Sequence, residues 1–200
     1  MPKPHPNTSE RLLHEGLRLL SQQGLRGVTL GKLAEHVGMS KSGVFAHFRS
    51  IEDVQIALLE HTAQSVAPVI IEPALRASEG LPRLEAFMHA WFGWTARAGL
   101  PGGCPVAAAM FELDDVEGPV REKVLELEVG WRKLLRLQID DAMRLGHLDS
   151  GLDPDQLVFE LCGIYLCHHV SLRFVRDPSA DTRAQRALAS LIERSRPARS

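Results

Sequence analysis

The spacing of apolar residues constrains the fold of this chain more than any other feature of its sequence. Apolar side chains recur every three or four positions along almost the whole chain, as one face of an α-helix requires, and alternating runs of β-branched residues are missing. This pattern predicts an all-α fold. Capping residues, glycines and prolines divide it into nine expected helices, over residues 8–23, 30–36, 41–48, 50–66, 82–98, 105–112, 119–145, 153–176 and 181–194.

The second and third of these helices are short and joined by a tight turn. Thr29 and Ser40 stand at N-cap positions, Gly38 permits the sharp turn, and small Ala34 allows close approach. Two short helices joined in this way form a helix-turn-helix, whose second helix enters the major groove of DNA. The N-terminus of that helix, residues 40–42, presents free backbone N–H groups to a phosphate or a base edge. A tight helical hairpin inside a bundle core is the alternative.

The two helices are expected to pack through a shared apolar face. Its predicted members are Leu30, Leu33, Ala34 and Val37 on the first helix and Val44, Phe45 and Phe48 on the second. Together with the helix expected over residues 8–23, they would form a three-helix head on a larger helical body.

Residues 10–59 resemble the DNA-binding head of the tetracycline-repressor (TetR/AcrR) family. The resemblance rests on the leading helix ending at Gly24, on the segment LAEHVGMSKSGVFAHF (33–48), and on Ser50 followed by Glu52 and Asp53. It implies a homodimeric, ligand-responsive repressor acting on a palindromic operator, with residues 1–52 binding DNA and residues 53–200 binding ligand and dimerising.

The same resemblance assigns residues to the DNA contact. By their positions Lys41, Ser42 and Gly43 would meet base edges, and Thr29, Ser40, Phe45 and His47 would hold phosphates; Lys32 is also predicted to bind DNA. Phe45 stands where the family usually has tyrosine, and Ile51 stands where lysine is common. Because Gly31 and Gly43 have no side chain, base readout would depend on Lys41 and Ser42, with DNA shape contributing the rest.

The net charge of −2 conceals an asymmetry between the head and the rest of the chain. Residues 1–50 carry seven basic and three acidic side chains, a net charge of +4, and residues 51–200 carry −6. A basic head on an acidic body suits a protein that offers one face to phosphate and repels it elsewhere.

Bulky side chains gather in the helices expected over residues 82–98, 105–112 and 119–145. The family resemblance implies that some of these side chains face a pocket, and five residues at helical spacing are predicted to line a cavity for a small apolar or aromatic effector: Met88, Trp91, Thr95, Phe111 and Trp131. His89 or Gln138 could add orienting hydrogen bonds. Plain core packing is the alternative, and it corresponds to a constitutive architectural or interaction protein without a ligand.

The last two expected helices are predicted to form a homodimer through residues 153–194, as a four-helix interface under two-fold symmetry. The predicted contact residues are Leu157, Leu161, Ile164, Tyr165, His168 and Leu172 on the first helix and Ala184, Leu188, Leu191 and Ile192 on the second.

The chain has three cysteines, an odd number without paired spacing, so we do not expect a disulfide framework. Cys104 precedes a helix start and is either a sensor thiol or a small packing residue. Cys162 and Cys167 are five residues apart on a helix, a spacing that does not converge on a metal. We expect a cytoplasmic protein that is not an enzyme, with no cofactor, no metal, no catalytic residues and no membrane segment or signal peptide.

Overall fold

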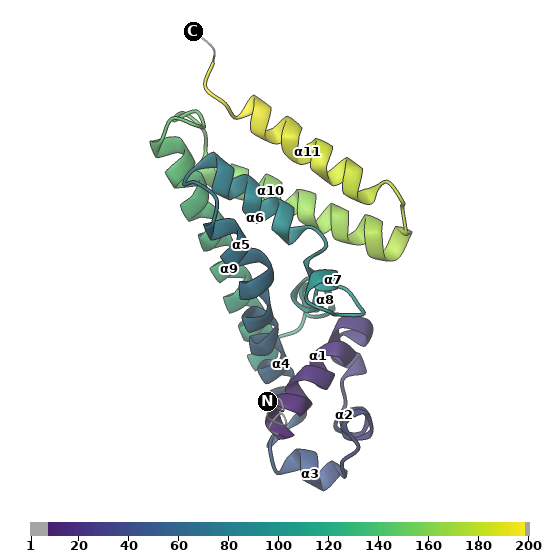
Figure 1. Cartoon of the computed structure of the whole chain (residues 1–200). Helices are drawn as coiled ribbons and strands as arrows, with labels where there is room; N and C mark the ends of the chain where they lie inside the picture. Colours follow the sequence, from purple (N-terminus) through teal and green to yellow (C-terminus); the bar gives the residue numbers. More distant parts are fainter. Residues whose placement is uncertain (1–7, 199–200) are drawn as a thin grey trace, which may run out of the picture. The chain divides into compact units, whose positions relative to one another are not determined.

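The computed structural model describes residues 8–198, which fold into helices without a β-strand (Figure 1). Lys3, included in the charge of the head, lies outside the described residues. The elements are α1 (Thr8–Gly27), α2 (Leu30–Val37), α3 (Lys41–Phe45), α4 (Ile51–Val66), the π-helical turn η1 (Ala67–Ile71), α5 (Glu72–Leu75), α6 (Leu81–Trp91), α7 (Trp94–Arg97), α8 (Pro105–Glu112), α9 (Pro119–Arg144), α10 (Pro154–Val170), the π-helical turn η2 (Ser171–Val175) and α11 (Ala180–Arg194).

The all-α prediction is confirmed, and the nine expected helices correspond to eleven α-helical segments within residues 8–198. The two additional segments are α5, which lies beyond the helix end expected at residue 66, and α7, which is a separate piece of the helix expected over residues 82–98. The chain forms two compact units. Among the described residues, the first contains 8–65 and 98–127 and the second contains 66–97 and 128–198, so α9 contributes residues to both.

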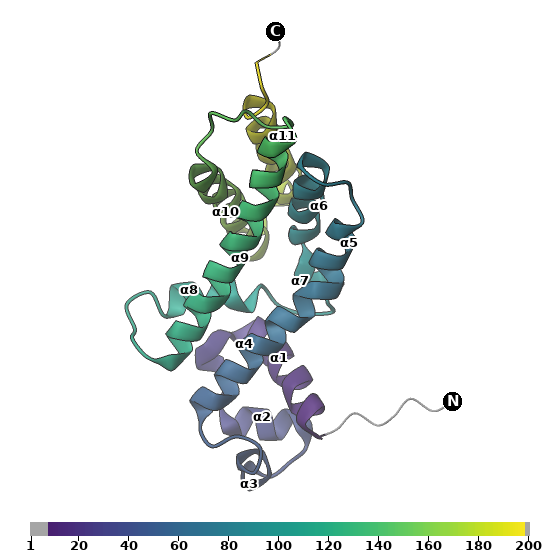
Figure 2. The ribbon, with the colours of Figure 1, turned by 90° about the vertical axis from the view of Figure 1, so that its left-hand side faces the viewer.

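Helices α1, α2 and α4 of the first unit lie close together (Figure 2) and share a leucine-rich core. Leu12, Leu33 and Leu58 are buried in it. At Gly16 the helices α1 and α4 approach so closely that a Cβ would lie 2.7 Å from Leu58 Cδ2. This core fixes the positions of the two short helices that follow α1 in the sequence.

Gly24 interrupts α1 with a φ of 69°, in agreement with the predicted stop at this residue. A further turn follows, and its free N–H groups are capped by a side chain from α8. Glu112 accepts hydrogen bonds from Leu25 N at 2.9 Å and from Arg26 N at 3.1 Å. The backbone of residues 99–103 also lies against α1, because Gly103 N donates to Ser21 O at 2.9 Å. The segment around α8 is therefore part of the first unit.

The α-helix that begins after Ser50 ends at Val66, as expected, but Pro68 and Pro73 do not break the helical path there, so that part of the prediction is wrong. The helical path continues from Ile51 to Leu75, through η1 and α5. Pro68 has no N–H to donate, and the chain accommodates it in a π-helical turn in which Glu72 N donates to Ala67 O, five residues back. A proline therefore changes the helix register here without breaking the helix.

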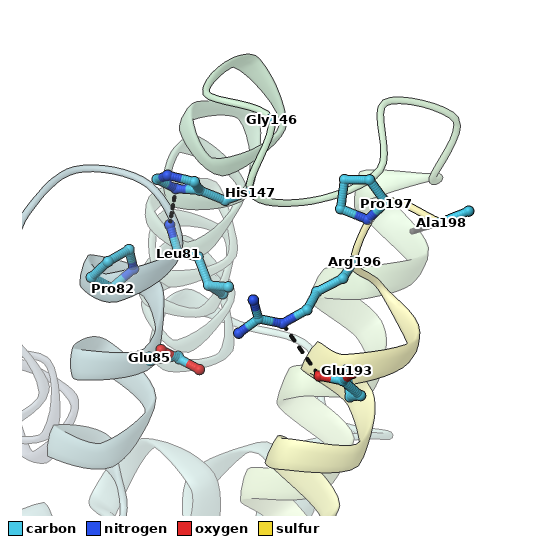
Figure 3. A pocket seen from close by; sticks show the side chains of 9 residues that line it. All are labelled: Leu81, Pro82, Glu85, Gly146, His147, Glu193, Arg196, Pro197 and Ala198. Atoms are coloured by element: carbon cyan, nitrogen blue, oxygen red, sulfur yellow. Dashed lines mark hydrogen bonds and ion pairs between the residues drawn. The ribbon is translucent and has the colours of Figure 1, made fainter. Parts of the chain in front are cut away.

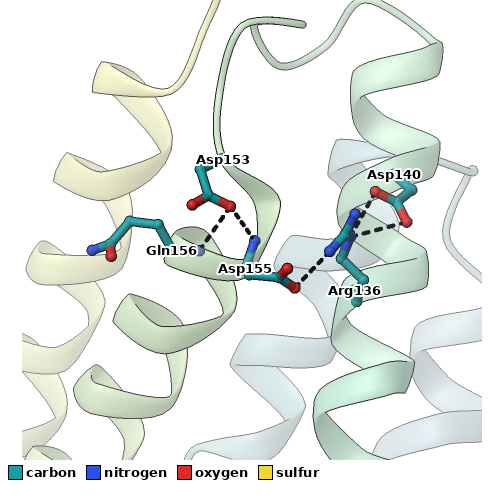
Figure 4. Close-up of polar contacts among 5 residues, drawn as sticks. All are labelled: Arg136, Asp140, Asp153, Asp155 and Gln156. Carbon is teal, nitrogen blue, oxygen red and sulfur yellow. Dashed lines mark hydrogen bonds and ion pairs between the residues drawn. The ribbon is translucent and has the colours of Figure 1, made fainter.

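Two side chains hold the N-termini of helices in the second unit. His147 Nδ1 accepts a hydrogen bond from Leu81 N at 3.2 Å, and Asp153 Oδ1 accepts from Asp155 N at 2.9 Å. Figure 4 shows Arg136 of α9 between Asp140 and Asp155, with Nε to Asp140 Oδ1 at 2.9 Å and Nη1 to Asp155 Oδ1 at 2.5 Å. These ion pairs join α9 to the first turn of α10.

Two helices have the length and composition of a membrane span, contrary to expectation. They are Ile51–Leu75 and Pro154–Val175, each with an 18-residue window of mean hydropathy 1.2 of which 28% is buried. Core helices of soluble proteins pass the same test, so length and hydropathy alone assign neither helix to a membrane.

Candidate nucleic-acid interface

The turn between α2 and α3 has the geometry that the sequence predicts. Gly38 adopts the left-handed conformation, with φ 67° and ψ 35°, and Met39 N donates to Ala34 O at 2.9 Å. Buried Ala34, Leu33 and Val44 form the contact between the two helices. Arg11 Nη2 donates to Val37 O at 3.0 Å and ties α1 to the C-terminal end of α2.

Side-chain caps define the N-termini of both helices. Thr29 Oγ1 accepts from Lys32 N at 3.2 Å, and Ser40 Oγ accepts from Gly43 N at 3.1 Å and lies 2.9 Å from Ser42 Oγ. The next helix begins in the same way, because Ser50 Oγ accepts from Asp53 N at 3.0 Å. The two predicted caps, Thr29 and Ser40, are therefore present, and the residues in the first turn of α3 are exposed or half-buried.

All eight residues predicted to bind DNA are accessible. Gly43 is half-buried, and the others are exposed: Thr29, Lys32, Ser40, Lys41, Ser42, Phe45 and His47. The side chain of Lys41 extends along Gly31, where a Cβ would lie 3.1 Å from Lys41 Cε. Lys32 Nζ donates to Gln23 Oε1 at 2.7 Å. Their contacts with DNA remain predictions.

Phe45 does not belong to the packing face on which the sequence analysis placed it. α3 ends at Phe45, three residues earlier than predicted, and the ring is 52% exposed, whereas Val44 is buried and Phe48 is half-buried. An exposed aromatic ring at the end of α3 is available for contact with a sugar–phosphate backbone.

The residues predicted to bind an effector do not all come together. Met88, Trp91 and Trp131 belong to the second unit, where the Trp91 and Trp131 rings lie 4.9 Å apart. Phe111 belongs to the first unit and is 61% exposed on α8. Thr95 is half-buried on α7, and His89 is exposed.

The aromatic cluster of the second unit consists of Phe87, Trp91, Trp131 and Tyr165. Trp91 stacks on Tyr165 with centroids 3.8 Å apart and planes 10° apart, and Phe87 meets Trp131 edge-on at 6.5 Å. Trp94 Nε1 donates to Tyr165 Oη at 3.0 Å and fixes that ring. The cluster joins α6, α9 and α10.

A surface hollow of about 690 Å³ lies elsewhere in the second unit (Figure 3). Its lining holds Glu85, Glu193 and Arg196, with Arg196 Nε 3.4 Å from Glu193 Oε2, and none of the residues predicted to bind an effector. The hollow is open to solvent and is lined by both charged and apolar residues, unlike the aromatic cluster.

The cysteines form no disulfide within residues 8–198. Burial raises the pKa of the Cys162 thiol from its ordinary value of 9.0 to about 11, so that it stays protonated at neutral pH. Burial also lowers the pKa of neighbouring His169, helped by the charges of Arg173 and His168. The described residues contain no group of three metal-ligating side chains.

Most of the predicted dimer contacts on α10 face the interior of the second unit. Leu157, Leu161, Tyr165 and His168 are buried, and His168 Nε2 lies 2.7 Å from Asp181 Oδ1. Because α10 is apolar around most of its circumference, periodicity could not identify its packed face. The apolar side chains that remain exposed on α10 and η2 are Phe159, Val170, Leu172, Phe174 and Val175.

A capped helix pair joined by a left-handed glycine, with an exposed N-terminus on its second helix, defines a helix-turn-helix DNA-binding protein. Residues 12–58 match the model of the bacterial regulatory proteins of the tetR family, and residues 80–188 match the tetracyclin repressor-like C-terminal domain. The chain belongs to the TetR family of DNA-binding transcriptional regulators, as the resemblance of residues 10–59 predicts.

Similar proteins span nearly the full length of the chain. The nucleoid occlusion factor SlmA of Sodalis glossinidius is 29% identical over 175 residues, which are 85% of this chain and 84% of that protein. A TetR-family regulator from Cytophaga hutchinsonii has the same fold, with a TM-score of 0.85 and 18% identity over 98% of this chain and 100% of the other. AibR, solved with isovaleryl coenzyme A and operator DNA, has a TM-score of 0.71 and 18% identity over 90% of this chain and 96% of its own.

Proposed function

We propose that this protein is a cytoplasmic, ligand-responsive repressor that binds a palindromic operator as a homodimer. The observation that carries the proposal is the first turn of α3, where Ser40, Lys41 and Ser42 are exposed beside a capped helix N-terminus. A free helix N-terminus with a lysine suits contact with phosphates and base edges.

In this proposal residues 1–52 bind DNA. Lys41 and Ser42 read base edges and Gly43 allows close approach, while Lys32, Thr29, Ser40, Phe45 and His47 meet the backbone. Bases are read by few side chains, because Gly31 and Gly43 have none. Specificity therefore depends in part on DNA shape, and contacts with phosphates supply a large share of the affinity.

Residues 53–200 dimerise and bind the effector in the same proposal. The outer surface of α10 and η2 supports dimerisation within residues 153–194, because Phe159 on α10 and Phe174 on η2 are 66% and 87% exposed. α10 and α11 lie side by side (Figure 1), as one half of a four-helix interface would. Because Leu157 and Leu161 are buried, they are no longer part of the proposed contact. The proposed contact is the exposed stripe of α10, which we define as Phe159 and Val170 together with Leu172, Phe174 and Val175 of the adjoining η2.

The response to an effector needs a link from the second unit to the first. The helix Ile51–Leu75 and helix α9 each run without a chain break from one unit into the other. A ligand that binds one arrangement of these helices more tightly than another shifts the equilibrium toward that arrangement. The resulting change in DNA affinity is limited by the difference between the ligand's affinities for the two arrangements. AibR provides a precedent, since its structure holds an acyl-coenzyme A and operator DNA together.

Genome-wide capture of DNA fragments with the full-length protein tests this function. We expect a small set of palindromic sites with half-sites about 34–36 Å apart, bound less tightly as salt increases. A screen of small aromatic compounds and acyl-coenzyme A thioesters should then release the captured site. Failure to enrich any sequence would contradict operator binding.

A second function, nucleoid occlusion without an effector, is favoured by the similarity to SlmA along most of both chains. The same capture distinguishes the two. An occlusion factor would have sites spread over the chromosome and no compound that releases them, whereas a repressor would have sites at a few promoters.

A further inference from the structure

Two buried polar atoms on α9 have no hydrogen-bond partner among residues 8–198: the indole nitrogen Nε1 of Trp131 and the amide oxygen Oε1 of Gln138. The two residues are seven positions apart, so they lie on nearly the same face of the helix, about 10 Å apart along its axis. Buried Leu135 lies between them on that face.

Unpaired atoms of this kind are uncommon and costly. A buried donor or acceptor without a partner gives up its hydrogen bonds to water and gains none in return, and folded proteins satisfy nearly all such groups. Gln138 is only 7% exposed and lies among buried Leu135, Ile139 and Ala142. One unpaired donor and one unpaired acceptor on one face form a complementary pair of anchors for a bound molecule.

The surroundings of Trp131 are aromatic. Its ring lies 4.9 Å from that of Trp91 and 6.5 Å from that of Phe87. The Trp131 side chain is half-buried while its nitrogen is buried, so the ring forms the boundary between this interior and solvent. A ligand that reaches Trp131 Nε1 would therefore contact aromatic rings.

The charges next to Trp131 compensate one another. Arg132 Nε lies 2.7 Å from Glu128 Oε1, one helical turn away on α9, so these two opposite charges already pair with each other. Burying an unpaired ionic group in such a place would cost far more than burying a hydroxyl or a carbonyl. The chemistry therefore favours a neutral molecule.

We propose that the interior beside α9 binds a neutral aromatic molecule whose carbonyl oxygen accepts from Trp131 Nε1 and whose hydroxyl donates to Gln138 Oε1. The inference rests on the proposed ligand-responsive function and names the chemical class of its effector. It also assigns Gln138 and Trp131 as the residues that determine specificity.

Calorimetric titration of the full-length protein with three probes tests this. The probes are 4-hydroxybenzophenone, which has both groups, benzophenone, which has no hydroxyl, and 4-benzylphenol, which has no carbonyl. We expect 4-hydroxybenzophenone to bind about tenfold more tightly than either of the others. Absence of binding by 4-hydroxybenzophenone, or equal affinities for the three, overturns the proposal.

Two variants assign the groups. Trp131→Phe should remove the advantage of the carbonyl, so that 4-hydroxybenzophenone binds no better than 4-benzylphenol, and Gln138→Leu should remove the advantage of the hydroxyl. Gln156→Leu, the same substitution at an exposed position of α10, should bind like the wild type. If both site variants still prefer 4-hydroxybenzophenone over the other two probes as the wild type does, the assignment of Trp131 and Gln138 is overturned.

A stability measurement keeps the test independent of any probe. Gln138→Leu removes an unpaired acceptor, so its thermal midpoint should equal or exceed that of the wild type. A lowered midpoint means that Gln138 is already satisfied in the folded chain and overturns the proposal. Release of the operator is measured separately. If a probe binds without releasing the operator, the result supports this site and contradicts ligand-responsive regulation. If only other compounds release the operator, the result supports ligand-responsive regulation and contradicts this site.

Discussion

Single side chains decide several local features of this fold, and not all of them are predictable. Thr29, Ser40 and Ser50 stand immediately before the helices that they cap, so the sequence predicts their contacts with N–H groups three residues on. Glu112 performs a similar task for Leu25 and Arg26 from more than eighty residues away. Local spacing contains no information about such a distant cap.

Replacing Glu112 should therefore destabilise the first unit. Glu112→Ala leaves the N–H groups of Leu25 and Arg26 without their acceptor, and we expect the free energy of unfolding to fall by about 1–2 kcal/mol. Glu117→Ala, at an exposed position of the following loop, should change it by less than about 0.5 kcal/mol. Urea denaturation of both variants makes the comparison, and equal stabilities would contradict a capping role.

The Cys162 thiol should make stability depend on pH in the alkaline range. Its pKa is raised from 9.0 to about 11 on folding, so the folded state retains a proton that the unfolded state loses. This contribution is fully present below pH 9 and is lost as the pH rises toward 11. The slope of unfolding free energy against pH between these values should be less steep in Cys162→Ala, and parallel slopes would refute the shift.

At the scale of helices and turns, the sequence predicts where a helix begins and ends better than it predicts which face of the helix is buried. Gly24 and Gly38 are recognised as helix ends, and both have positive φ. Pro68 is misleading because a π-helical turn accommodates it. On α10 apolar residues surround the helix, so the sequence could not show that the face containing Leu161 is buried within the unit. On α8 it could not show that Phe111 is exposed to solvent.

Two glycines offer the same substitution with opposite expected effects. Gly38 has a φ of 67°, and no described atom lies within 4 Å of an added Cβ, so Gly38→Ala should cost about 1–2 kcal/mol of stability from backbone strain alone. Gly130 lies in helical α9 and its added Cβ is equally free of described neighbours. Gly130→Ala should therefore stabilise the protein by roughly 0.5–1 kcal/mol. Thermal unfolding of both would show whether the signs differ.

At the scale of the whole molecule, assembly should depend on the exposed stripe of α10. Phe159→Glu places a charge where we propose that a second copy packs, and it should shift the protein from dimer to monomer. Phe111→Glu, at a similarly exposed ring in the other unit, should remain dimeric. Analytical ultracentrifugation distinguishes the two. Leu161→Glu is unsuitable because Leu161 is buried, so the charge would disrupt the fold itself.

The most direct test of DNA recognition by α3 is the affinity of Lys41→Ala for the best captured operator, measured by fluorescence anisotropy beside Lys133→Ala. Lys133 is exposed on α9 and loses the same charge far along the sequence from the helix-turn-helix. We predict that Lys41→Ala loses about 1–3 kcal/mol of specific binding and relaxes sequence preference, while Lys133→Ala binds like the wild type. Unchanged affinity and unchanged preference in Lys41→Ala would contradict the assignment of α3 as the recognition helix.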